Sequence, residues 1–155
     1  VYAGLILSFP QSAHQPWHQD GEALFGEMED GRDLPPYALN VFIPLDRVTE
    51  ELGPTELWLK SHKESTAKEI MKVLSTSTDD NDDHTNNDPI IGPTLSRGSV
   101  LMYDYRICHR GTRNLSDTSV RPMLYLMYAR PWFQEHLNFG SQRLFPTTTT
   151  TTTQE

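Results

Sequence analysis

The sequence predicts an all-β domain, a sandwich or barrel of antiparallel strands with one short helix. Short apolar or alternating runs recur along the chain, and Pro, Gly, Asn and Asp separate them. Several of these runs are apolar on both faces, which is expected where two sheets are layered. The 155 residues suffice for one compact domain and are too few to expect two.

Eight segments are predicted as strands. In chain order they are residues 2–9, 14–20, 37–45, 56–60, 90–95, 99–105, 107–110 and 123–130. Turn residues support these bounds, because Pro44 ends the third segment and the pair Gly53-Pro54 precedes the fourth. The tripeptide Ser96-Arg97-Gly98 is a tight connection between the fifth and the sixth.

One segment, residues 66–74, is predicted as a helix. Ile70, Val73 and Leu74 are spaced i, i+3, i+4, and Lys and Glu side chains occupy the opposite side. A single helix inserted among many strands argues against alternating βαβ units.

The core domain is expected to span residues 1–135. Within it, residues 75–88 are low-complexity Ser, Thr, Asp and Asn, which predicts an acidic mobile loop. Residues 136–155 are expected to be a C-terminal tail, with seven consecutive threonines at 147–153. The chain begins with Val1 in the middle of a strand-like run, which suggests a fragment that lacks an N-terminal region.

Charge and composition exclude several classes of partner. The net charge is −8, and residues 79–88 supply five of the acidic groups, so the acidity is concentrated in one loop. The absence of a Lys/Arg stripe argues against nucleic-acid binding. No stretch approaches the roughly 18 apolar residues of a membrane span. The single cysteine, Cys108, excludes an intrachain disulfide and fits a reducing compartment such as the cytoplasm. No pattern predicts an oligomeric state.

Two histidines and an aspartate form the candidate metal site. His18 and Asp20 are i and i+2 on a predicted strand, so both side chains are expected to project from one face. His109 lies about ninety residues later, at the start of another strand. Two imidazoles and one carboxylate suit non-haem Fe(II) and leave coordination positions open. The other histidines have no comparable partners and are expected to be surface or hydrogen-bonding groups.

Arg121 is the candidate anion-binding residue. It precedes the longest predicted strand, where a surface salt bridge would be an ordinary role. The sharper interpretation is that its planar guanidinium pairs with the far carboxylate of a dicarboxylic cosubstrate.

These motifs together resemble the phytanoyl-CoA dioxygenase family. The resemblance rests on His18 with Asp20, on Gly53-Pro54-Thr55-Glu56 followed by Ser61-His62, on the run from His109 through Asn114 to Arg121-Pro122, and on Arg130-Pro131-Trp132-Phe133. It covers about residues 1–135 and lacks the helical region that usually precedes the core. It implies a double-stranded β-helix, the cupin-like jelly-roll, with one short inserted helix.

The resemblance also implies a function and its groups. His18, Asp20 and His109 match the family's iron ligands, and Arg121 matches the arginine that binds 2-oxoglutarate. The implied activity is a Fe(II)- and 2-oxoglutarate-dependent dioxygenase. With dioxygen, it would hydroxylate a small-molecule or lipid-like substrate and release succinate and CO2.

Three further residues are candidate cosubstrate contacts. In similar enzymes a glutamine just before the first histidine, or between the histidine and aspartate ligands, contacts the cosubstrate or substrate, which selects Gln15 and Gln19. Strand alternation directs Gln19 away from the ligands, so Gln15 is favoured. Phe42 matches a position that can be aromatic over the cosubstrate, although a plain core role explains it equally well.

Two other functions remain open at this point. One is a non-catalytic jelly-roll protein that binds or regulates, and the intact ligand set argues against it. The other is a cupin-like hydrolase or isomerase with another metal. Arg121 argues against that alternative, because hydrolysis needs no dicarboxylate clamp.

Overall fold

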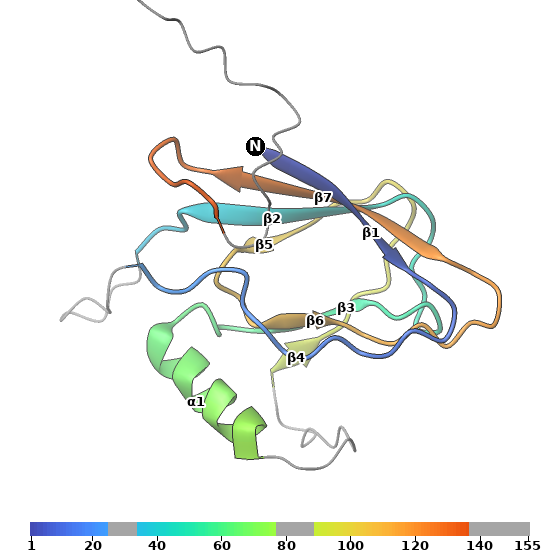
Figure 1. Cartoon of the computed structure of the whole chain (residues 1–155), viewed down its shortest axis with the longest axis horizontal. Coiled ribbons are helices and arrows are strands. Elements are labelled where there is room, and N and C mark those ends of the chain that lie inside the picture. The colour runs from blue at the N-terminus through green and yellow to red at the C-terminus, as the bar shows by residue number, and fades with distance from the viewer. Residues whose placement is uncertain (25–33, 77–88, 137–155) are drawn as a thin grey trace, which may run out of the picture.

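The computed structural model describes residues 1–24, 34–76 and 89–136. Two antiparallel sheets face each other, and one helix packs on the outer side of the smaller sheet (Figure 1). The elements are β1 (Tyr2–Ser8), β2 (Ala38–Pro44), β3 (Thr55–Trp58), α1 (Glu64–Thr76), β4 (Ile90–Ile91), β5 (Leu101–Asp104), β6 (His109–Gly111) and β7 (Arg121–Ala129). This arrangement confirms the predicted all-β fold with one short helix.

Strands that are far apart in the sequence are neighbours in both sheets. The larger sheet has the order β1-β7-β2-β5, and the smaller has the order β4-β3-β6. Arg121, at the start of β7, therefore pairs with Ser8 at the end of β1. His109, at the start of β6, pairs with Leu57 of β3 in the opposite sheet. The topology thus places the two candidate groups on different sheets that share one interior.

The predicted strand over residues 14–20 is wrong. In the structure this segment makes one isolated antiparallel bridge, between His18 and His109, and no continuous ladder. The helix is longer than predicted and includes residues 75 and 76, the first two of the predicted acidic loop. Its first turn carries Glu64, which favours the helix N-terminus and pairs with Lys68 at i+4. The remainder of that loop, residues 77–88, and the predicted tail from residue 137 onward lie outside the described residues.

Buried side chains gather in three clusters. The first lies between the sheets and contains Phe42, Val48, Leu57, Tyr103, Ile107 and Met123. The second joins the smaller sheet to α1 and contains Trp17, Trp58, Ile70 and Cys108. The third contains Tyr37, Ala38, Tyr105 and Met127. Burial raises the pKa of the Cys108 thiol to about 11, so this cysteine packs as a small apolar group. Within the described residues, no helix is both long and apolar enough to cross a membrane.

Candidate metal centre

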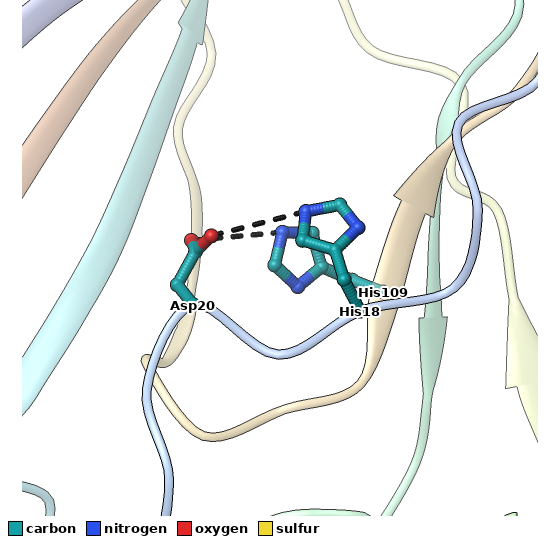
Figure 2. Close-up of side chains that lie close together, drawn as sticks. All are labelled: His18, Asp20 and His109. Carbon is teal, nitrogen blue, oxygen red and sulfur yellow. Dashed lines mark ion pairs between the residues drawn. The ribbon is translucent and has the colours of Figure 1, made fainter. Parts of the chain in front are cut away.

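His18, Asp20 and His109 converge on one point (Figure 2). Each offers one donor atom, and these atoms all lie within 4.8 Å of one another. Asp20 Oδ1 is 3.8 Å from His18 Nε2, and Asp20 Oδ2 is 3.7 Å from His109 Nε2. His109 is buried, whereas the other two side chains are partly exposed. The strand predicted for His18 and Asp20 is absent, yet the structure brings all three predicted residues together.

Both imidazole rings are oriented by backbone carbonyls. His18 Nδ1 lies 2.9 Å from Pro16 O, and His109 Nδ1 lies 2.9 Å from Ile107 O. A carbonyl oxygen can only accept, so each Nδ1 carries the proton and each Nε2 presents a lone pair. Burial lowers the pKa of His109, and nearby His18 lowers it further, whereas Asp20 acts in the opposite direction. The neutral imidazole is the form that binds a metal.

Pro16 explains why this segment is not a strand. The bridge pairs His18 with His109, so a regular ladder would next pair Pro16 with Gly111. Proline has no N–H to donate. Gln15 N donates to Gly111 O instead, at 2.9 Å, and Gly111 N donates to the side chain Oε1 of Gln15, at 2.8 Å. The carbonyl of Pro16 is left to accept from the His18 ring. The break in the ladder therefore helps to orient a candidate ligand.

Two residues that the sequence analysis missed hold Asp20. Asn40, which is fully buried on β2, donates from Nδ2 to Asp20 Oδ2 at 2.7 Å. Tyr125 Oη donates to Asn40 Oδ1 at 3.0 Å and lies 3.4 Å from Asp20 Oδ2. Burial and the charge of Asp20 raise the pKa of Tyr125, so it remains a protonated donor. Asn40 could have been recognised in the sequence as a single polar residue between Leu39 and Val41 in an otherwise apolar strand.

Replacing Asn40 with alanine should weaken metal binding about 10- to 100-fold, the usual effect of losing a group that orients a ligand. Calorimetric titration of the metal-free protein with Co(II) measures this loss directly. Tyr125→Phe is the matched comparison, because it removes the longer contact to Asp20 and the bond to Asn40 Oδ1 but keeps the short Asn40–Asp20 hydrogen bond, so it should cost less. Wild-type affinity in a folded Asn40→Ala variant would show that Asp20 needs no support.

Arg121 lies in the interior and forms no ion pair with any residue that the structure describes. Only 6% of the residue is exposed, and neither Nε nor Nη1 has a hydrogen-bond partner among the described residues. Burial lowers the pKa of this guanidinium. A Cβ on Gly111 would lie 3.3 Å from Arg121 Nη2 and 2.7 Å from Gln15 Oε1, so both side chains border the same strand position. Buried donors without partners are costly, and an anion that accepts a hydrogen bond from either of them would reduce this cost.

Gln19 and Phe42 occupy different places from Gln15. Gln19 Nε2 donates to the carbonyl oxygens of Arg106 and Ser61, so its amide ties two loop segments together. Phe42 lies in the cluster between the sheets, with its ring centroid 5.4 Å from that of Tyr103 and 5.2 Å from that of Tyr125. The Tyr103 ring is in turn 5.1 Å from the His109 ring. Phe42 thus reaches the site through aromatic neighbours.

The two facing sheets form a cupin-like jelly-roll, and two imidazoles with one carboxylate are the donor set of a non-haem iron site. The sequence model of the phytanoyl-CoA dioxygenase family matches residues 5–123, and the chain belongs to that family. This confirms the predicted family and the predicted double-stranded β-helix.

Several solved structures are similar in fold. AviO1 from Streptomyces viridochromogenes Tue57 is 26% identical with a TM-score of 0.61, and the match covers 84% of this chain and 50% of that protein. EctD from S. alaskensis with bound Fe is 21% identical with a TM-score of 0.57, covering 82% and 43%. EvdO2 from Micromonospora carbonacea var. aurantiaca, complexed with 2-oxoglutarate, is 23% identical with a TM-score of 0.55, covering 81% and 49%. The chain spans half the length of the first and less of the others.

Proposed function

We propose that this chain is the core of a Fe(II)- and 2-oxoglutarate-dependent dioxygenase that hydroxylates a small-molecule or lipid-like substrate and releases succinate and CO2. One observation carries the proposal above all others. A cluster of two imidazole Nε2 atoms and one carboxylate lies in the same interior as a buried guanidinium whose Nε and Nη1 have no partner among the described residues. The first feature suits the metal and the second suits the cosubstrate, and neither a hydrolase nor an isomerase requires both.

His18, Asp20 and His109 would hold the metal. They supply three donors, so further coordination positions would be open to exogenous ligands. Iron with 2-oxoglutarate and dioxygen supplies the oxidising power needed to hydroxylate an unactivated C–H bond. The protein contributes the fixed Nε2 lone pairs and one carboxylate, which offsets part of the charge of the ion. Asn40 and Tyr125 keep that carboxylate in place.

Arg121 would bind the distal carboxylate of 2-oxoglutarate. Nε and Nη1 lack partners among the described residues, and either would donate a charge-assisted hydrogen bond to that carboxylate. Gln15 lies next to the same position and is the better of the two glutamine candidates. Gln19 is the weaker candidate, because its amide already bonds two backbone carbonyls. Phe42 would contribute an apolar wall near the cosubstrate.

An anaerobic titration tests this function. Fe(II) and then 2-oxoglutarate are added to the metal-free protein, and the visible charge-transfer band of the chelate is monitored. A saturable band that reaches one equivalent of each component is the expected result. Metal binding without a band on addition of 2-oxoglutarate would favour the cupin-like hydrolase or isomerase. Absence of metal binding would favour the non-catalytic alternative.

A further inference from the structure

A pocket of about 280 Å³ lies beside the turn that carries Asp20. Its lining residues are Leu24, Leu34, Pro35, Tyr37, Arg106, Arg130 and Trp132. Tyr37 joins this pocket to the turn, because its hydroxyl donates to Glu22 O at 2.9 Å. A Cβ on Gly21 would lie only 2.2 Å from Tyr37 Oη, so the turn after Asp20 packs directly on this ring. One wall of the pocket is thus in contact with the turn that follows Asp20.

β2 begins and β7 ends at the same end of the larger sheet (Figure 1). The lining residues Tyr37 and Arg130 directly adjoin these two strand ends. Arg130 N donates to Tyr37 O at 2.8 Å, which joins the chain after β7 to the start of β2. Apart from two arginines, the wall is apolar and aromatic. Trp132 is 57% exposed, and its ring centroid lies 6.3 Å from that of Tyr37. A concave site with a large exposed aromatic side chain is typical of ligand binding.

The two arginines in the wall differ in their charge balance. Arg106 is neutralised by Asp104, to which Nε donates at 2.9 Å and Nη2 at 2.7 Å. Arg130 donates from Nε to Pro36 O at 3.3 Å, and it has no carboxylate partner in the part of the chain that the structure describes. The acidic side chains near Tyr37 besides Asp104 are Asp20, a candidate metal ligand, and Glu22, which is exposed and screened by solvent. Within the described residues, Arg130 is therefore the arginine of this pocket that forms no ion pair with a carboxylate.

We propose that this pocket binds the substrate that is to be oxidised, and that the substrate is a small organic anion with an apolar or aromatic body. The anionic group pairs with Arg130, and the body packs against Trp132 and Tyr37. The volume is near the lower end of the range for ligand sites, so the substrate is small. Its role as substrate rests on the proposed dioxygenase function, whereas the binding of an organic anion does not.

The first test compares an acid with its uncharged analogue. The probes are 4-phenylbutyrate and 4-phenylbutyramide, titrated into metal-free protein by calorimetry. The acid should bind about fivefold more tightly than the amide, the effect of an ion pair at a partly exposed site. Arg130→Gln should abolish that difference. The matched control is Arg97→Gln, an exposed arginine in the turn beside Pro44 at the other end of β2, and it should leave both affinities unchanged.

The remaining outcomes separate this proposal from the proposed function. Trp132→Ala should weaken the binding of both probes. Equal affinity of the wild type for the acid and the amide would overturn the inference that the ligand is an anion. Absence of binding of either probe would overturn the pocket itself. With Fe(II) and 2-oxoglutarate bound, the acid should perturb the charge-transfer band, and an unchanged band would overturn the role as substrate site. If the wild-type protein bound the acid but not 2-oxoglutarate, the anion-binding pocket would be supported and the proposed dioxygenase function would be overturned.

Discussion

Replacing Asp20 with alanine is expected to abolish turnover and to lower metal affinity by more than about 100-fold, beyond the usual effect of losing a residue that only orients a ligand. Asp20 is the only anionic donor of the candidate cluster, and two neutral imidazoles cannot replace its charge. Calorimetric titration with Co(II) measures the loss of affinity, and succinate formation measures the loss of turnover.

The control for this prediction must separate metal binding from folding. Asp20→Ala leaves Asn40 Nδ2 without its acceptor, which costs about 1–3 kcal/mol of stability. Circular dichroism should nevertheless show a folded protein. Asp46→Ala changes an exposed aspartate that accepts a hydrogen bond from Arg47 N, and it should bind metal as the wild type does. Near-normal metal affinity in Asp20→Ala would remove Asp20 from the ligand set.

Most of the strands could be predicted because their signals are local. In β7, the side chains of Arg121, Met123 and Met127 are buried at positions separated by even numbers of residues, as a half-buried strand requires. The prediction began that strand two residues late. Burying an arginine at its start depends on pairing with Ser8 of β1, and that partner is more than a hundred residues away.

The segment before Asp20 failed as a strand for a physical reason that the sequence contained. Pro16 has no N–H, so the ladder cannot continue from the His18–His109 bridge. The prediction that the two ligand side chains project from one face was based on strand geometry, and that basis was wrong. A bridge at His18 and a bend at Asp20 bring the side chains together instead.

The candidate site was predictable only in part. The residue types and the resemblance identified His18, Asp20 and His109, because these belong to recognisable motifs. Asn40 and Tyr125 belong to no motif, and their contact with Asp20 depends on how β2 and β7 pair. The unpartnered state of Arg121 likewise follows from tertiary burial, which no local pattern encodes.

Arg121→Ala should weaken 2-oxoglutarate binding by roughly one to two orders of magnitude or more, since hydrogen bonds to charged groups contribute about 1.5–3 kcal/mol each. Metal affinity should change little, because Arg121 contributes no donor to the cluster. Arg121→Lys should recover only part of the loss, as a point charge cannot reproduce the planar guanidinium. The dissociation constant of 2-oxoglutarate is measured for all three proteins with Fe(II) present and oxygen excluded.

Arg121→Ala is also expected to leave the thermal stability of the protein unchanged, which is unusual for the truncation of a buried side chain. In the absence of cosubstrate, Arg121 keeps two buried donor atoms unpartnered, so its removal relieves a desolvation cost that offsets the packing lost with its aliphatic stem. Thermal unfolding of Arg121→Ala should therefore match that of the wild type without 2-oxoglutarate, and only the wild type should gain stability when it is added. If Arg121→Ala bound 2-oxoglutarate as tightly as the wild type does, another residue would have to bind the distal carboxylate of the cosubstrate. Arg113 is then the better candidate, because Arg110 already pairs with Glu56 and stacks on Trp17.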